Sequence, residues 1–136
     1  MHESRPAGYP QGVSDLAIEL ESTEEAPHEA RQTIRARFAD RLPATTLYDL
    51  LTVVTELVAN GVRYGKGETV RVKIGLNGDG TVTGEVENEG SGTGVERPID
   101  LDNATGIGLR IVAALVRQWR VVVNSTTRVR FELREP

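Results

Sequence analysis

The stretch from Thr45 to Gly65, TTLYDLLTVVTELVANGVRYG, constrains the fold of this chain more than any other segment. Its apolar residues recur at intervals of three and four, which is the period of one buried helical face. They are Leu47, Leu50, Leu51, Val54, Leu57 and Val58. The stretch therefore predicts a long amphipathic helix on the core, which Gly65 and Gly67 end.

Two polar residues lie at the border of that apolar face. Glu56 and Asn60 are four residues apart, so they stand about one turn apart on one flank of the helix. A carboxylate can act as a base, and a carboxamide oxygen can bind magnesium. The alternative is an exposed Glu and an exposed Asn on a surface helix. Gly61 favours a site, because glycine inside a helix costs about 1 kcal/mol relative to Ala and suits a close approach to the backbone.

Composition limits the possible classes of protein. With 136 residues, 38% of them apolar, we expect one domain at residues 14–136 after a flexible arm at residues 1–13 rich in Pro and Gly. A net charge of −4 argues against nucleic acid as a partner, and the absence of cysteine excludes disulfides and thiolate metal sites. No apolar run is long enough to span a membrane, and the N-terminus lacks the apolar core of a signal peptide. We therefore expect a cytoplasmic protein without membrane contact.

The segment before the long helix predicts one strand and one helix. From Asp15 to Glu21 apolar and polar residues mostly alternate, as in a half-buried strand. Ser22 to Glu25 has capping-box spacing and Pro27 suits a first turn, so a helix is expected to begin near Thr23. The buried face of this helix is expected to comprise Ala30, Ile34 and Phe38. Pro43 separates it from the long helix.

The segment after the long helix predicts a β-hairpin. Residues 70–76 and 82–86 alternate strictly around the turn Asn77-Gly78-Asp79-Gly80. The strand period places Asn88 on the core-facing row with Val82 and Val86. A polar side chain there needs a partner, and a bound ligand is one candidate. Residues 91–105 have no regular period and are predicted to form a loop or lid.

The last segment predicts a third helix and two more strands. Thr105-Gly106-Ile107-Gly108 opens the helix, and the glycines leave room for a phosphate at its exposed amides. Strands are expected at Arg120–Asn124 and Thr127–Arg134. The element order β α α β β α β β predicts an α+β two-layer sandwich with helices on one face of a mixed, mostly antiparallel sheet. The expected buried face of the helix is Leu109, Val112, Leu115, Val116 and Trp119.

Three motifs in this order resemble the GHKL superfamily of ATP-binding domains, shared by type II topoisomerases, a family of chaperones and sensor histidine kinases. ELVANGVRYG from Glu56 resembles the N box, VENEGSG from Val86 occupies the place of the adenine-binding box, and GIGLRIV from Gly106 resembles the glycine box. The resemblance covers about residues 15–134. It implies a Bergerat-type fold that binds ATP and Mg²⁺.

The resemblance also implies roles for particular residues. Glu56 would activate the attacking nucleophile and Asn60 would coordinate magnesium. The residues expected to bind the nucleotide are Asn60, Arg63, Asn88, Gly90, Gly92, Thr105, Gly106, Ile107, Gly108 and Leu109.

Four positions depart from the superfamily pattern. Asn88 replaces the usual Asp, so the acceptor for the adenine amino group lacks a charge and nucleotide affinity is expected to be low. Gly61 replaces the usual Ala, Tyr64 the usual His, and Ile107 stands where the nearest relatives often have Arg. These changes bear on phosphate handling rather than on the fold.

Within the superfamily, the chain is most similar to anti-sigma-factor serine/threonine kinases. That resemblance implies a transcription regulator whose partner is a sigma factor, an anti-anti-sigma protein of the STAS type, or both, with a homodimer possible. One alternative is a partner-binding module of the same fold with weak or no ATP turnover. Another is an isolated histidine-kinase-like domain, although neither His2 nor His28 has the helical dimerisation context of a phosphoacceptor.

Overall fold

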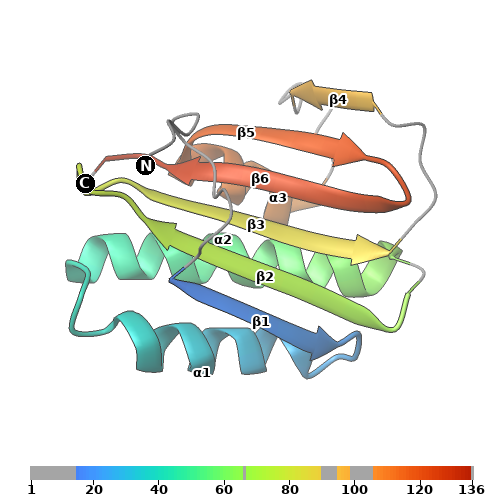
Figure 1. Ribbon diagram of the computed structural model, residues 1–136, viewed down its shortest axis with the longest axis horizontal. Helices are drawn as coiled ribbons and strands as arrows, with labels where there is room; N and C mark the ends of the chain where they lie inside the picture. The colour runs from blue at the N-terminus through green and yellow to red at the C-terminus, as the bar shows by residue number, and fades with distance from the viewer. Residues whose placement is uncertain (1–14, 66, 90–94, 99–105, 136) are drawn as a thin grey trace, which may run out of the picture.

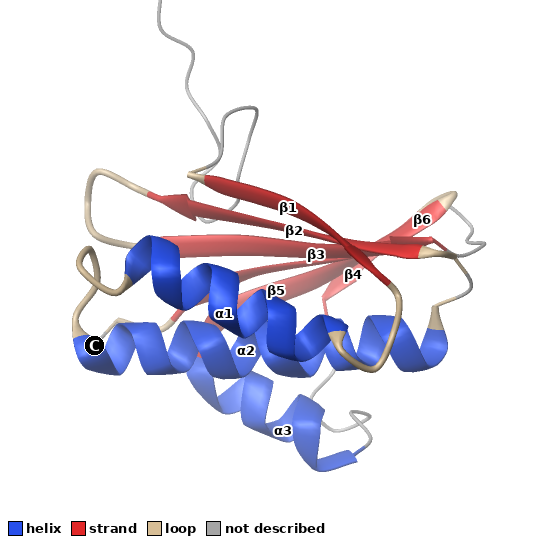
Figure 2. Ribbon diagram, turned by 90° about the horizontal axis from the view of Figure 1, so that it is seen from below, coloured by secondary structure: helices blue, strands red, loops and turns tan. Residues whose placement is uncertain are grey.

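The computed structural model describes residues 15–65, 67–89, 95–98 and 106–135. They form a six-stranded antiparallel sheet with helices on one face (Figures 1 and 2), which confirms the α+β two-layer sandwich. The elements are β1 (Leu16–Glu21), α1 (Ala26–Phe38), α2 (Ala44–Tyr64), β2 (Thr69–Leu76), β3 (Val82–Glu89), β4 (Val95–Pro98), α3 (Gly106–Leu115), β5 (Val116–Val123) and β6 (Thr126–Leu133). The strand order in the sheet is β1-β2-β3-β6-β5-β4. The predicted arm at residues 1–13 lies outside the described residues.

The core lies between α2 and the sheet. Leu50, Val54 and Val58 of α2 are completely buried, as the helical period predicted, and Val53 is buried with them. The facing residues of β2 are Val70, Val72 and Ile74, which are also completely buried. α1 covers the β1 side of the sheet and buries Ala30, Ile34 and Phe38, as expected.

Asp15 ties three elements together at one end of the sheet. Its carboxylate accepts hydrogen bonds from the backbone N–H of Leu76, at 2.6 Å, and from Arg41, at 3.3 Å. Its carbonyl oxygen accepts a further hydrogen bond from Arg37. The start of β1 is thereby held to the end of β2 and to the end of α1.

The predicted β-hairpin is confirmed. β2 and β3 pair antiparallel with Val72 opposite Val86, and the backbone N–H of Asn77 donates to the Thr81 carbonyl at 2.9 Å. Gly80 closes the turn with a φ of 90°, a value that favours glycine. Hydrogen bonds from the backbone N–H and the hydroxyl of Thr81 hold the pKa of the exposed Asp79 below its ordinary value.

The start of the first helix was predicted wrongly, because α1 begins at Ala26 rather than near Thr23. The Thr23 hydroxyl accepts a hydrogen bond from the backbone N–H of Glu25, at 3.3 Å, two residues along the chain. That short turn replaces the predicted capping box, and Glu25 stands outside the helix as its N-cap residue. Pro27 lies in the first turn, where it needs no intrahelical donor.

The boundary after the third helix was also predicted wrongly. α3 ends at Leu115, and the expected helical residues Val116 and Trp119 belong to β5. Their spacing fits a helix, but Trp119 and Val121 also fit the period of a strand. Pairing with β6 decides the matter, because Trp119 lies opposite Phe131 and Val121 opposite Val129.

The expected loop at residues 91–105 contains a strand. Val95–Pro98 forms β4, which pairs antiparallel with β5 at the sheet edge, so the element order gains one strand. Four residues are too few to show a period, and in the structure they pair with the edge of β5. The remainder of the expected lid lies outside the described residues. Among the helices that the structure describes, none is long and apolar enough to cross a membrane.

Gly84 allows the central packing of β3 on β6, and its replacement tests that contact. A Cβ atom at Gly84 would overlap the ring of Phe131, its cross-strand neighbour. We expect Gly84→Ala to lower the free energy of unfolding by about 1–3 kcal/mol, because the buried ring must shift. Urea unfolding measures the change.

Gly78→Ala is the matched control for this test, since a Cβ atom there would meet nothing within 4 Å. We expect it to change the stability by less than about 0.5 kcal/mol. Equal stability of the Gly84→Ala variant and the unmodified protein would show that the Phe131 ring packs elsewhere.

Candidate functional site

The orientation of α2 places Glu56 and Asn60 on one side of the helix. α2 lies between α1 and α3 (Figure 2), and Arg31 of α1 donates to the Thr55 hydroxyl at 3.2 Å. The flank of Thr55 therefore faces α1. Successive helical residues are about 100° apart, so Glu56 and Asn60 project toward the opposite flank, where α3 packs.

Asp49 lies on the same flank of α2 as Glu56, nearer to the start of the helix. It precedes Glu56 by seven residues, or about two turns, and is buried with 7% of its surface exposed. Its carboxylate accepts a hydrogen bond from Arg134, just beyond β6, at 3.2 Å. A buried carboxylate without such a partner is strongly destabilising, so the pair restrains the rotation of α2 on the sheet. Sequence reasoning missed Asp49, although its helical spacing from Glu56 and Asn60 could have indicated it.

Glu56 and Asn60 are both half-buried. Neither side chain forms a hydrogen bond or an ion pair with another of the described residues. The carboxylate and carboxamide oxygens thus keep their hydrogen-bonding capacity at the border of the core. A base and a magnesium ligand need that capacity.

Asn88 lies beside the end of α2. It is half-buried at the end of the core-facing row of β3, which confirms its predicted position. A Cβ atom built on Gly61 would lie 3.6 Å from the Asn88 Cβ and 3.7 Å from its Oδ1. The Asn88 Nδ2 donates to the Glu89 carbonyl at 3.2 Å, which leaves Oδ1 as an acceptor beside the helix.

The first turn of α3 belongs to the same end of the molecule. Figure 2 shows α3 beside α2, starting toward the end at which α2 finishes. Gly106, Ile107 and Gly108 are in this turn, and the half-buried Leu109 packs against the core. Backbone N–H groups at a helix start carry a partial positive charge and suit a phosphate.

The other predicted binding residues either lie outside this group or fall outside the described residues. Arg63 is exposed near the end of α2, and its guanidinium lies over the Tyr64 ring, 5.6 Å from the centroid. Gly90, Gly92 and Thr105 lie outside the described residues. The structure thus gathers Asn60, Asn88 and the start of α3 at one end, with Glu56 one turn earlier on α2.

This arrangement supplies three chemical functions along one side of α2. A carboxylate can accept a proton, two carboxamide oxygens can bind a metal or a hydrogen-bond donor, and a helix start can bind phosphate. Within the part of the chain that the structure describes, no three His, Cys, Asp or Glu residues group as a metal site. The combination suits a ligand with phosphate groups, whose oxygens could complete the coordination of a metal ion.

Known proteins resemble this chain in sequence and in fold. A family model described as histidine kinase-, DNA gyrase B-, and HSP90-like ATPase matches residues 46–136. No curated protein matches the chain. The fold is similar to the crystal structure of the RsbU and RsbW domains of Rv1364c from Mycobacterium tuberculosis, with a TM-score of 0.68 and 24% sequence identity. The match covers 89% of this chain but only 33% of that one, and it shows the fold alone.

The two glycines near the end of α2 are expected to respond oppositely to replacement by alanine. A Cβ atom at Gly61 would meet its neighbours at ordinary contact distances of 3.5–3.7 Å, so the close approach expected from the sequence does not require glycine. We expect Gly61→Ala to raise the free energy of unfolding by about 0.5–1 kcal/mol, because alanine favours the helix.

A Cβ atom at Gly65 would instead overlap the Gly61 carbonyl oxygen and lie 2.5 Å from the Asn88 Nδ2. We expect Gly65→Ala to lower the stability by about 1–3 kcal/mol. Urea unfolding of both variants gives the comparison. A Gly65→Ala variant as stable as the unmodified protein would show that neither the Gly61 carbonyl nor Asn88 packs against this position.

Proposed function

Because the chain belongs to the histidine kinase-, DNA gyrase B- and HSP90-like ATPase family, we propose that it binds ATP with Mg²⁺ at the end of α2. The observation that carries the proposal is the half-buried pair Glu56 and Asn60 on the flank of α2 toward α3, on the helix whose end packs against Asn88. We propose further that the protein phosphorylates a serine or threonine of a protein partner.

The residues of this chain fit the bound nucleotide. Asn60 offers a carboxamide oxygen with no partner among the described residues, and magnesium accepts such an oxygen together with phosphate and water oxygens. Asn88 would offer Oδ1 to the amino group of the base. Bound magnesium ATP would supply the transferable phosphoryl group.

The chain itself would do the positioning and the proton transfer. Glu56 would accept the proton of the attacking hydroxyl while the hydroxyl oxygen forms its bond to the γ-phosphorus of ATP. The bond from that phosphorus to the bridging oxygen would break, and ADP would leave with the electron pair. The N–H groups at the start of α3 would bind phosphate oxygens and offset their charge. Asn60 lies one turn from Glu56, so one rigid helix would position both the base and the metal.

The proposed partners are a sigma factor, an anti-anti-sigma protein of the STAS type, or both. The motif wording at Glu56–Gly65 and the similarity to a structure with an RsbW domain support this choice. A cytoplasmic location and a homodimer are part of the same proposal. Incubation with radiolabelled ATP, Mg²⁺ and a STAS-type protein tests it, because the label should move to a serine or threonine of the partner.

A second candidate function is a partner-binding module with weak or no turnover. The neutral Asn88 favours it, because the superfamily motif has a charged Asp at this position. A titration with ATP, with and without Mg²⁺, separates the two candidates. Saturable binding that depends on Mg²⁺ supports the kinase, and absence of binding supports the module.

The role of Glu56 is tested by Glu56→Gln. The side chain flanks the core without a hydrogen bond to a described residue, so we expect unchanged stability within about 0.5 kcal/mol. Phosphate transfer should fall by about 10²–10⁴-fold, because the amide cannot accept the proton. ATP binding should persist.

Glu29→Gln, on the exposed side of α1, is the control and should transfer phosphate at the unmodified rate. Transfer at the unmodified rate by the Glu56→Gln protein as well would exclude Glu56 as the base.

The position of Asn88 is tested by Asn88→Asp. The carboxylate would accept a charge-assisted hydrogen bond, which is about twice as strong as a neutral one, so ATP affinity should rise. The variant also loses the Nδ2 donor to the Glu89 carbonyl, so stability should fall by about 1 kcal/mol. Calorimetry measures the affinity and urea unfolding the stability. Weaker or unchanged ATP binding would mean that residue 88 does not contact the base.

A further inference from the structure

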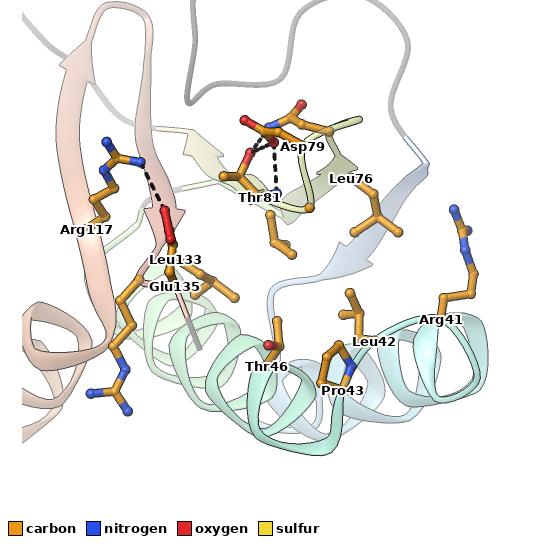
Figure 3. A pocket seen from close by; sticks show the side chains of 14 residues that line it. Arg41, Leu42, Pro43, Thr46, Leu76, Asp79, Thr81, Arg117, Leu133 and Glu135 are labelled. Atoms are coloured by element: carbon orange, nitrogen blue, oxygen red, sulfur yellow. Dashed lines mark hydrogen bonds and ion pairs between the residues drawn. The ribbon is translucent and has the colours of Figure 1, made fainter.

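A pocket of about 580 Å³ opens at the other end of the molecule. It lies between the start of α2, the β2–β3 turn and the residues around the end of β6 (Figure 3). Its volume lies within the range of about 300–1,000 Å³ typical of small-molecule sites. Its apolar wall consists of Leu42, Pro43, Leu76, Val82 and Leu133. α2 has 21 residues and is therefore about 30 Å long, so the pocket is separate from the candidate nucleotide site at the end of that helix.

One buried polar group lines this pocket without a partner. Thr46 has 7% of its surface exposed, and its hydroxyl oxygen is buried with no hydrogen bond. A buried hydroxyl without a partner costs free energy that a bound acceptor would recover. Threonine in a helix populates two χ1 rotamers, so one rotation exchanges the methyl and the hydroxyl at the pocket wall.

The start of α2, of which Pro43 and Thr46 line the pocket, has further unused donors. Pro43 is the N-cap residue and supplies no side-chain hydrogen bond, and the first helical hydrogen bond runs from the Leu47 N–H to the Pro43 carbonyl. Among the described residues, none accepts from the N–H groups of Ala44, Thr45 and Thr46. These groups form the positive end of the longest helix in the described part of the chain.

Three arginines line the pocket, and each is paired with a carboxylate but keeps unused donors; Arg41 contacts Asp15 at 3.3 Å. Arg117 contacts Glu132 at 3.1 Å, and Arg134 contacts Asp49 at 3.2 Å. Each guanidinium has five N–H donors, so most of them remain available to a ligand. The carboxylates of Glu132 and Asp49 are nearly buried behind their arginines, which offset their charge at the pocket.

The acceptors of the pocket are fewer. Asp79 is engaged within its own turn by two hydrogen bonds from Thr81, of 3.0 Å from the backbone and 2.7 Å from the hydroxyl. Glu135 is mostly exposed and lies 3.9 Å from Arg117. Most of the pocket's hydrogen-bonding groups that are still available are therefore donors. A ligand that is rich in hydrogen-bond acceptors would complement them.

We propose that this pocket is a second ligand site, which binds a small organic acid. The apolar body of the acid would pack against Leu76, Val82 and Leu133, and its carboxylate would face Thr46 and the start of α2. Arg117 would contribute a guanidinium from the rim. The site does not depend on ATP binding at the far end of α2.

A ¹⁵N-labelled full chain titrated with 1-naphthylacetate tests the proposal by NMR, with 1-naphthylacetamide as the neutral analogue. We expect saturable shifts around Thr46, Thr81 and Leu133, with a Kd of about 1 mM or tighter for a ligand of this size. The amide should bind about tenfold more weakly, because it lacks the charge. Saturating magnesium ATP should not displace the acid.

Two variants test the polar contacts, with one matched control. Thr46→Val keeps the shape and removes the hydroxyl, so the acid should bind about three- to tenfold more weakly. Arg117→Gln should have a similar effect, and it leaves Glu132 with its hydrogen bond from Gln118 at 3.0 Å. Thr52→Val should bind as the unmodified protein does, because the Thr52 hydroxyl donates to the Tyr48 carbonyl on the same helix.

Four results would overturn the proposal, in variants whose spectra show the native fold. They are the absence of saturable binding, equal affinity for the acid and the amide, an affinity unaffected by Thr46→Val, and displacement by magnesium ATP. Absence of ATP binding would contradict the proposed kinase function and leave this second site intact.

Discussion

The burial of the apolar face of α2 against the sheet is the interaction on which the rest of the structure depends. Leu50, Val54 and Val58 each lose all contact with water there. Burying such a side chain contributes roughly 1.5–3 kcal/mol, and no other helix of the described chain offers so long an apolar face. The candidate nucleotide site lies at the end of α2 and the pocket lies at its start. The orientation of this helix therefore also determines where both sites form.

Hydrophobic burial does not set a unique rotation of a helix, and polar contacts on the two flanks of α2 add that specificity. Arg31 binds Thr55 on the flank toward α1, and Arg134 binds the buried Asp49 on the other. Together they direct Glu56 toward α3. The proposed base therefore has its orientation set by residues that would not touch the nucleotide.

The two ends of α2 differ in chemistry for a simple physical reason. At its start, backbone N–H groups and the unpartnered Thr46 hydroxyl present donors to a pocket with an apolar wall. At its end, Asn88 packs beside Gly61 and Gly65 and adds an acceptor to the end that carries Asn60. The start suits an anion without a metal, whereas the end supplies the oxygen ligands that a metal-bound nucleotide requires.

The sequence by itself determined α2, the hairpin, the fold class and the flank shared by Glu56 and Asn60, because these follow from periods of 3.6 and 2 along the chain. Tertiary structure decided the rest. Val116 and Trp119 have helical spacing, whereas Trp119 and Val121 have the period of a strand, and the register with β6 made these residues a strand. The packing of Asn88 against α2 and the pocket beside Thr46 join segments distant in sequence, and no local pattern encodes such contacts.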